Sequence, residues 1–116
     1  MTLEEFRTHC LLKAYTSEQL PFDSKTLVFK VGSKMFALVD IDAAKSVNLK
    51  CDPERAIELR ESFLEIQPGY HMSKVHWNTV SLNESLEDEM IFELIDHSYD
   101  LVVNSLTKKE KVSLES

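Results

Sequence analysis

A predicted β-hairpin at residues 27–38 constrains the fold more than any other feature of the sequence. Apolar residues alternate along both of its strands, at Leu27, Phe29, Val31, Phe36 and Leu38. Between the strands, Gly32-Ser33 has the length and the leading glycine of a type II′ turn. That turn pairs Phe29 with Phe36 and Leu27 with Leu38, so one face of the hairpin is apolar. The chain must therefore contain an antiparallel sheet with a second layer covering that face.

Three later segments are predicted to extend this sheet. Residues 47–51 alternate between apolar and polar, residues 66–72 are extended, and residues 74–82 form a last strand. In the last strand the apolar side carries Val75 and Trp77, and the opposite side carries Lys74, His76 and Asn78. Val80 has the parity of this polar set, so we expect the strand either to have a bulge near Thr79 or to change face there.

Helical spacing of apolar residues predicts three helices, at residues 3–16, 53–64 and 86–106. Their start signals are a Thr2–Glu5 capping box, Asp52 before Pro53, and Ser85. Residues 106–116 are expected to be a solvated tail that carries Lys108, Lys109 and Lys111. The element order predicts one α+β domain over residues 1–116, a two-layer fold with a single antiparallel sheet and helices packed on one face.

Composition fits a small globular protein that needs no cross-links. A chain of 116 residues buries enough surface to fold without a disulfide or a metal. We interpret Cys10 and Cys51 as reduced core thiols. The polar, acidic residues 2–5 do not resemble a signal peptide, and no apolar run approaches a membrane span. We expect a cytoplasmic monomer with no cofactor and no membrane contact.

Four segments together point to a known family. They are Pro68-Gly69-Tyr70-His71-Met72-Ser73-Lys74-Val75-His76-Trp77-Asn78-Thr79-Val80, residues 94–103, residues 26–32 and residues 48–54. Their order and spacing resemble the MmcQ/YjbR family across essentially the whole chain. The resemblance implies a compact CyaY-like fold, and members are commonly described as DNA-binding proteins or regulators. Ser73 departs from the pattern, because an Asn or Asp is expected there.

Charge is distributed unevenly along the chain. Residues 24–51 contain five lysines and two aspartates, and residues 66–83 contain Lys74 and no acid, although the whole chain carries a formal charge of −7. The acids therefore concentrate on the predicted helices and connectors. The strand face turned away from the helices, which we call the open face, is predicted to be basic. The residues predicted to bind an anion or a nucleic acid are Lys30, Lys50, His71, Lys74, His76, Trp77 and Asn78.

Each of these residues also has a plain structural interpretation. Lysines are common on any solvated sheet face. The four cationic candidates, Lys30, Lys50, Lys74 and His76, are fewer than the phosphate contacts of a tight DNA-binding protein. Trp77 has the parity of a core residue, so only an exposed Trp77 or Tyr70 would stack on a base. Metal binding by His71, His76, His97 and Cys51 is not expected, because their spacing matches no zinc pattern.

Catalysis is not predicted. The chain contains no Gly-rich phosphate loop and no nucleophile elbow. Asp96 and His97 are adjacent on a helix and point about 100° apart, so they do not form a dyad. The sequence thus favours a non-catalytic domain that binds DNA through its open face. The alternatives are a protein-interaction or chaperone-like module that binds a peptide, and a site for a small anionic ligand at His71, Lys74 and His76.

Overall fold

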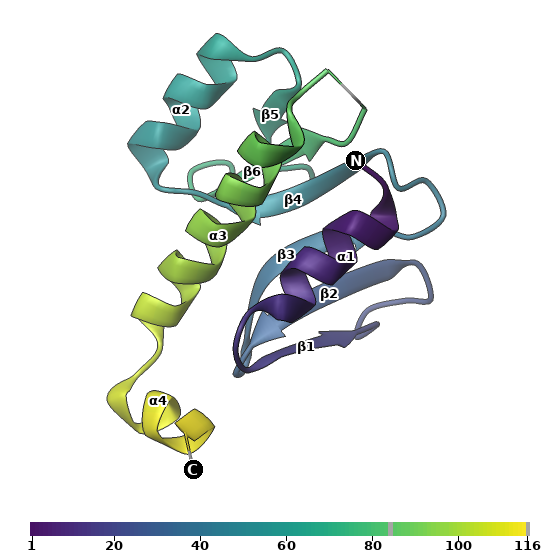
Figure 1. The fold of residues 1–116 in the computed structure, drawn as a ribbon. Coiled ribbons are helices and arrows are strands. Elements are labelled where there is room, and N and C mark those ends of the chain that lie inside the picture. The colour runs from purple at the N-terminus through teal and green to yellow at the C-terminus, as the bar shows by residue number, and fades with distance from the viewer. Residues whose placement is uncertain (84, 116) are drawn as a thin grey trace.

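The computed structural model describes residues 1–83 and 85–115, and they form one sheet with four helices (Figure 1). The strand order is β1-β2-β3-β4-β6-β5, and every neighbouring pair is antiparallel. The strands are β1 (Thr16–Gln19), β2 (Thr26–Val31), β3 (Lys34–Asp40), β4 (Ser46–Lys50), β5 (Ile66–Pro68) and β6 (Trp77–Ser81). The helices are α1 (Leu3–Leu12), α2 (Pro53–Ser62), α3 (Asp88–Ser105) and α4 (Lys108–Glu115).

Helices α1, α2 and α3 cover one face of the sheet (Figure 1). The core between the layers combines Phe6 of α1, Ile91 and Ile95 of α3, and inward-facing strand residues such as Phe29 and Leu49. α2 contributes Ala56, which is fully buried, and Leu59, which packs on the same cluster. The predicted α+β architecture with helices on one face of a single antiparallel sheet is confirmed.

Helix starts agree with the sequence better than helix ends do. Thr2 and Glu5 form the reciprocal capping box, and Asp52 accepts a hydrogen bond from the Arg55 amide ahead of α2. The expected Ser85 cap is wrong, because α3 begins at Asp88 and its N-cap residue makes no side-chain bond. The first helix stops at Leu12 instead of continuing to residue 16.

The residues after α1 form an edge strand that the sequence analysis missed. Strand β1 pairs with β2, with Glu18 opposite Phe29. The Arg7 guanidinium of α1 donates two hydrogen bonds of 2.7 Å to the Glu18 carboxylate. This bidentate contact ties the short strand to the helix above it. Polar residues with no apolar alternation gave no sequence signal for this strand.

The hairpin contains a bulge that changes its register. Val31 lies opposite Lys34 as predicted, but Phe29 lies opposite Ala37, and Val28 opposite Leu38. The expected Phe29–Phe36 and Leu27–Leu38 pairs are therefore wrong. One extra residue in β3 lets Phe36 and Ala37 both enter the helix-side core, and it turns Leu38 to the open face.

The C-terminal segment was expected to be a solvated tail, but it contains helix α4. Leu114 of α4 packs on the core, and its side chain would lie 3.7 Å from a Cβ placed on Gly32, whose φ is 60°. Glu110 accepts a hydrogen bond from Ser33, and Lys34 donates to the Ser105 carbonyl. The helix therefore docks on the β2–β3 turn, while the lysines Lys108, Lys109 and Lys111 remain exposed. None of the helices formed by residues 1–83 and 85–115 combines the length and the apolar character that a membrane crossing requires.

Candidate functional site

Among the described residues, no helix covers the open face, but a loop of the chain crosses it. Val28, Leu38 and Trp77 form a small cluster there, separate from the main core, and Met35 and Met72 pack against it. Met72 belongs to residues 69–76, the loop that joins β5 to β6. The open face is therefore partly covered by this loop, and Trp77 beneath it is only 8% exposed.

Hydrogen bonds hold the loop on the sheet. The Gly69 amide donates to the Trp77 carbonyl at 2.9 Å, and the Tyr70 amide donates to the Thr79 hydroxyl at 2.9 Å. The Asn48 side chain donates to the Tyr70 carbonyl at 3.1 Å. A Cβ on Gly69 would lie 2.7 Å from the Trp77 Cβ, so only glycine fits the close approach of the two segments.

Arg60 of α2 fixes the far end of the loop from the helix side. Its Nε donates to Asn78 Oδ1 at 2.6 Å, and its Nη2 donates to the carbonyls of Trp77 (3.1 Å) and Lys74. One guanidinium thus satisfies three acceptors at the start of β6. Arg60 follows Leu59 in the apolar stripe of its helix, and no partner for it was predicted from the sequence. A cationic residue in an apolar stripe was the available signal.

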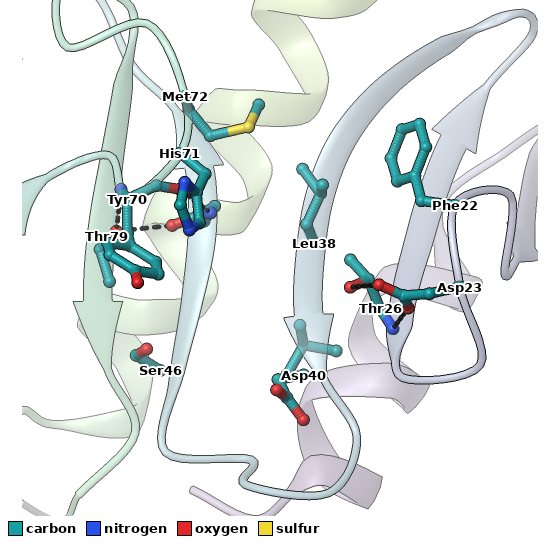
Figure 2. Close-up of a pocket in the computed structure, with 12 residues that line it drawn as sticks. Phe22, Asp23, Thr26, Leu38, Asp40, Ser46, Tyr70, His71, Met72 and Thr79 are labelled. Carbon is teal, nitrogen blue, oxygen red and sulfur yellow. Dashed lines mark hydrogen bonds between the residues drawn. The ribbon is translucent and has the colours of Figure 1, made fainter.

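A hollow lies on the open face beside the loop (Figure 2). It encloses about 350 Å³ between Tyr70 and His71 on one side and Phe22 on the other, with Leu38 between them. We use the word hollow for the space lined by Phe22, Asp23, Thr26, Leu38, Val39, Asp40, Ser46, Asn48, Tyr70, His71, Met72 and Thr79. Phe22 and Tyr70 are 65% and 69% exposed, so the hollow has two solvent-facing aromatic rims.

The hollow is acidic. Asp23 Oδ1 accepts hydrogen bonds from the amides of Lys25 and Thr26 at 2.8 and 2.7 Å, and these bonds hold the pKa of Asp23 below its usual value. Asp40 Oδ1 accepts from the amides of Asp42 and Ala43. No lysine or arginine is found among the described residues that line the hollow. Two carboxylates held by short turns therefore line the hollow beside the apolar side chains of Leu38 and Met72 and the polar side chains of Asn48 and Thr79.

His71 is the one predicted site residue that lines the hollow. Its backbone is left-handed, with φ of 59°, a conformation that costs a non-glycine residue of order 1 kcal/mol. Its ring lies 4.0 Å from the Tyr70 ring, centroid to centroid. The neighbouring hydrogen bonds of the loop maintain this strained position at the rim.

The predicted lysines separate into two groups. Lys30 and Lys50 lie on the open face, opposite Met35 and Trp77 in the pairing, so they share one end of that face. Lys74 lies in the loop instead of a strand, and its ammonium donates to the Gly69 carbonyl. His76 is also in the loop and exposed, and its carbonyl accepts from the Cys51 amide. Two lysines thus remain where the prediction placed them.

Trp77 and Asn78 have the opposite orientation to the one predicted. Trp77 joins the open-face cluster, whereas Asn78 points to the helix side and is 2% exposed. Asn78 therefore bonds to Arg60 instead of facing solvent. The expected bulge near Thr79 is absent from the β4–β6 register, which runs without interruption. The shared parity of Asn78 and Val80 was the correct signal for the core side.

The other side chains considered for catalysis or metal binding, Asp96, His97 and Cys51, lie outside the hollow. Asp96 accepts from His9 at 2.7 Å and from Lys13 at 2.6 Å, and His97 accepts from the Asp52 amide. Burial raises the pKa of the Cys51 thiol to about 11, so it stays protonated at neutral pH. Within residues 1–83 and 85–115, no three His, Cys, Asp or Glu side chains gather as a metal site. The arrangement offers binding contacts on the open face.

Comparison with known proteins places this arrangement in a family. The YjbR family model matches residues 11–101. The uncharacterized protein YjbR of Escherichia coli K12 is 35% identical over 112 residues, 96% of this chain and 95% of that protein. The uncharacterized protein YbdF of E. coli O157:H7 is 36% identical over 78% of this chain and 75% of that protein.

Two solved structures are similar along most of their length. Deinococcus radiodurans protein DR2400, with a DUF419 domain, superimposes with a TM-score of 0.91 at 41% identity, over 98% of this chain and 88% of that one. A Pseudomonas syringae protein superimposes with a TM-score of 0.74 at 31% identity, over 88% of this chain and 99% of that one. The chain therefore belongs to the YjbR family.

Proposed function

We propose that this chain is a non-catalytic binding domain whose open face holds a segment of a partner protein. The observation that carries the proposal is the hollow at the centre of that face, with Phe22 and Tyr70 exposed on its two rims. Aromatic side chains are enriched where proteins bind one another, because they bury a large area at a small entropic cost. Exposed aromatic rims around a hollow with both apolar and polar lining are suited to a side chain supplied by a partner.

The distribution of charge on the open face also favours a protein partner. Lys30 and Lys50 make one end positive, whereas Asp23 and Asp40 make the hollow negative. A uniform polyanion would meet repulsion at the hollow. A protein segment with charges of both signs matches both ends of the face.

Site-specific photocrosslinking tests this proposal. We expect Tyr70→p-benzoylphenylalanine to capture one protein from nuclease-treated cell lysate, and we expect Phe22→Ser in the same chain to abolish that capture. The control is the same photoreactive residue in place of Leu12, which is 77% exposed on α1. Equal capture at both positions, or no capture at position 70, would reject the proposal.

DNA binding is the second candidate, and Lys30 and Lys50 carry it because they share the open face. Tyr70, exposed on the same face, would stack on a base. If the two lysines neutralise two phosphates, a plot of log affinity for duplex DNA against log salt concentration should have a slope of roughly −2. We expect Lys30→Gln with Lys50→Gln to remove that slope in titrations of labelled oligonucleotides. Affinity that is absent at low salt would eliminate this candidate.

A small anionic ligand at His71, Lys74 and His76 has the weakest support. The Lys74 ammonium already donates to the Gly69 carbonyl, so an anion would have to break that bond. His71 lies at the rim of a hollow whose two carboxylates repel anions. A thermal-shift screen with inorganic phosphate tests this option, and we expect no stabilisation.

A further inference from the structure

We infer that the hollow receives an arginine side chain from the partner segment. This inference rests on the proposed function, because it names what the partner must place in the hollow. Three features of the lining carry it: two carboxylates, exposed aromatic rims and the apolar side chains of Leu38 and Met72.

The two carboxylates give the lining a negative charge, which the neighbouring Lys25 offsets in part at Asp23. Among the ion pairs formed by the described residues, none involves Asp23 or Asp40, whereas nearby Asp42 pairs with Lys25 at 3.6 Å. Asp40 uses one oxygen for two backbone amides, and none of the residues that the structure describes donates a hydrogen bond to its second oxygen. Hydrogen bonds to the Asp23 carboxylate favour its ionised form. A cation in the hollow would therefore meet acceptors that are already oriented.

The remaining lining residues match the shape of arginine. Leu38 and Met72 offer apolar contact to the three methylenes of the side chain. Phe22 and Tyr70 stand on opposite sides of the hollow (Figure 2), and aromatic rings attract a guanidinium. A guanidinium stacks on aromatic rings and loses its hydration more readily than an ammonium, so arginine fits this lining better than lysine.

The test uses short labelled peptides and the full chain. The probes are acetyl-Ala-Leu-Arg-Leu-Ala amide, labelled with fluorescein, and the same peptide with citrulline in place of arginine. Citrulline keeps the length and the planar end of arginine but removes its charge. We expect the arginine peptide to bind about tenfold more tightly, as a charge-assisted contact implies. Backbone amide NMR shifts should concentrate at Leu38, Asn48 and Thr79.

Charge-removing variants give the matched comparison. We expect Asp40→Asn to weaken the arginine peptide about fivefold and to leave the citrulline peptide unchanged. Asparagine can still accept the turn hydrogen bonds, so the loop should stay folded. The control is Asp42→Asn, which removes the same charge from outside the hollow and should change affinity by less than about twofold.

The possible outcomes separate the two proposals. Equal affinity for both peptides, with shifts on the open face, would overturn the arginine inference and leave the proposed function standing. Absence of shifts on the open face with either peptide would count against both. Binding of N-acetylarginine amide as tightly as the peptide would show a small-molecule cation site, and it would also overturn the inference.

Discussion

At the residue scale, one guanidinium connects the two layers of the molecule. Arg60 reaches from α2 to three acceptors where the loop of residues 69–76 meets β6. Without it, the buried Asn78 side-chain oxygen loses its donor, whereas the Trp77 carbonyl keeps the Gly69 amide and the Lys74 carbonyl is exposed to water. The position of the loop, and therefore the position of Tyr70 and Met72, depends on this contact.

We predict that Arg60→Ala lowers the free energy of unfolding by about 2–3 kcal/mol, because the buried Asn78 side-chain oxygen loses its charged donor. Arg55→Ala on the same helix is the matched control. Within the described part of the chain, the Arg55 guanidinium bonds to the exposed Glu93 carboxylate alone, so its loss should cost less than about 1 kcal/mol. Urea unfolding of both variants measures the difference, and equal losses would contradict the role given to Arg60.

A second prediction at this scale concerns pH. Burial, followed by the nearby Arg55 charge, lowers the pKa of His97 below its ordinary value of 6.5. The unfolded chain therefore binds the proton first as pH falls, so His97 contributes a loss of stability below about pH 6.5. We expect His97→Gln to reduce the slope of stability against pH below that value. Urea midpoints measured from pH 7.5 to 5 check this, and an unchanged slope would contradict it.

Residue parity shows what the sequence can and cannot predict. The capping residues Thr2 and Asp52 were correctly identified because their signals are local. The sides of Trp77 and Asn78 were assigned the wrong way round, because an aromatic residue was taken to mark the core. The open face has its own small apolar cluster under a loop, and no local pattern reveals a second cluster. The acidic hollow was missed for the same reason, since Phe22 and Tyr70 are far apart in the chain.

At the element scale, the regular patterns predicted the sheet and the main helices, and the irregular pieces were missed. Strand β1 is polar and short, and the bulge in β3 follows from packing Phe36 and Ala37 side by side under the helices. Neither feature produces a hydrophobic periodicity in the sequence. Helix α4 was missed because only Leu114 among its residues packs on the core.

Helix α4 gives the prediction that belongs to this scale. Because its main apolar contact is Leu114 on the β2–β3 turn, we expect deletion of residues 108–116 to cost about 1–2 kcal/mol of stability. The shortened chain should still unfold in one cooperative step. Leu114→Ser in the full chain should reproduce most of the loss. Urea unfolding followed by far-UV and by near-UV circular dichroism measures both the stability and the cooperativity. Loss of cooperative unfolding would show that α4 is integral to the core.

At the scale of the whole molecule, the sheet separates two environments. One face is sealed by three helices, and the other is closed only in part, by the loop of residues 69–76. The family and the layer arrangement followed from the sequence, because both depend on long, ordered patterns. The contacts that the open face offers to a partner could not be predicted from the sequence, because they depend on how the loop crosses the sheet.

The single tryptophan makes the state of the open face measurable. Trp77 is 8% exposed, and Met72 of the loop packs against its cluster. We therefore predict that Met72→Ala shifts Trp77 emission to longer wavelength and increases acrylamide quenching. The matched control is Met90→Ala, because Met90 packs on the opposite layer and its loss should leave the emission unchanged. Equal spectra for the two variants would mean that the loop does not shield the open face, and a partner would then meet Trp77 directly.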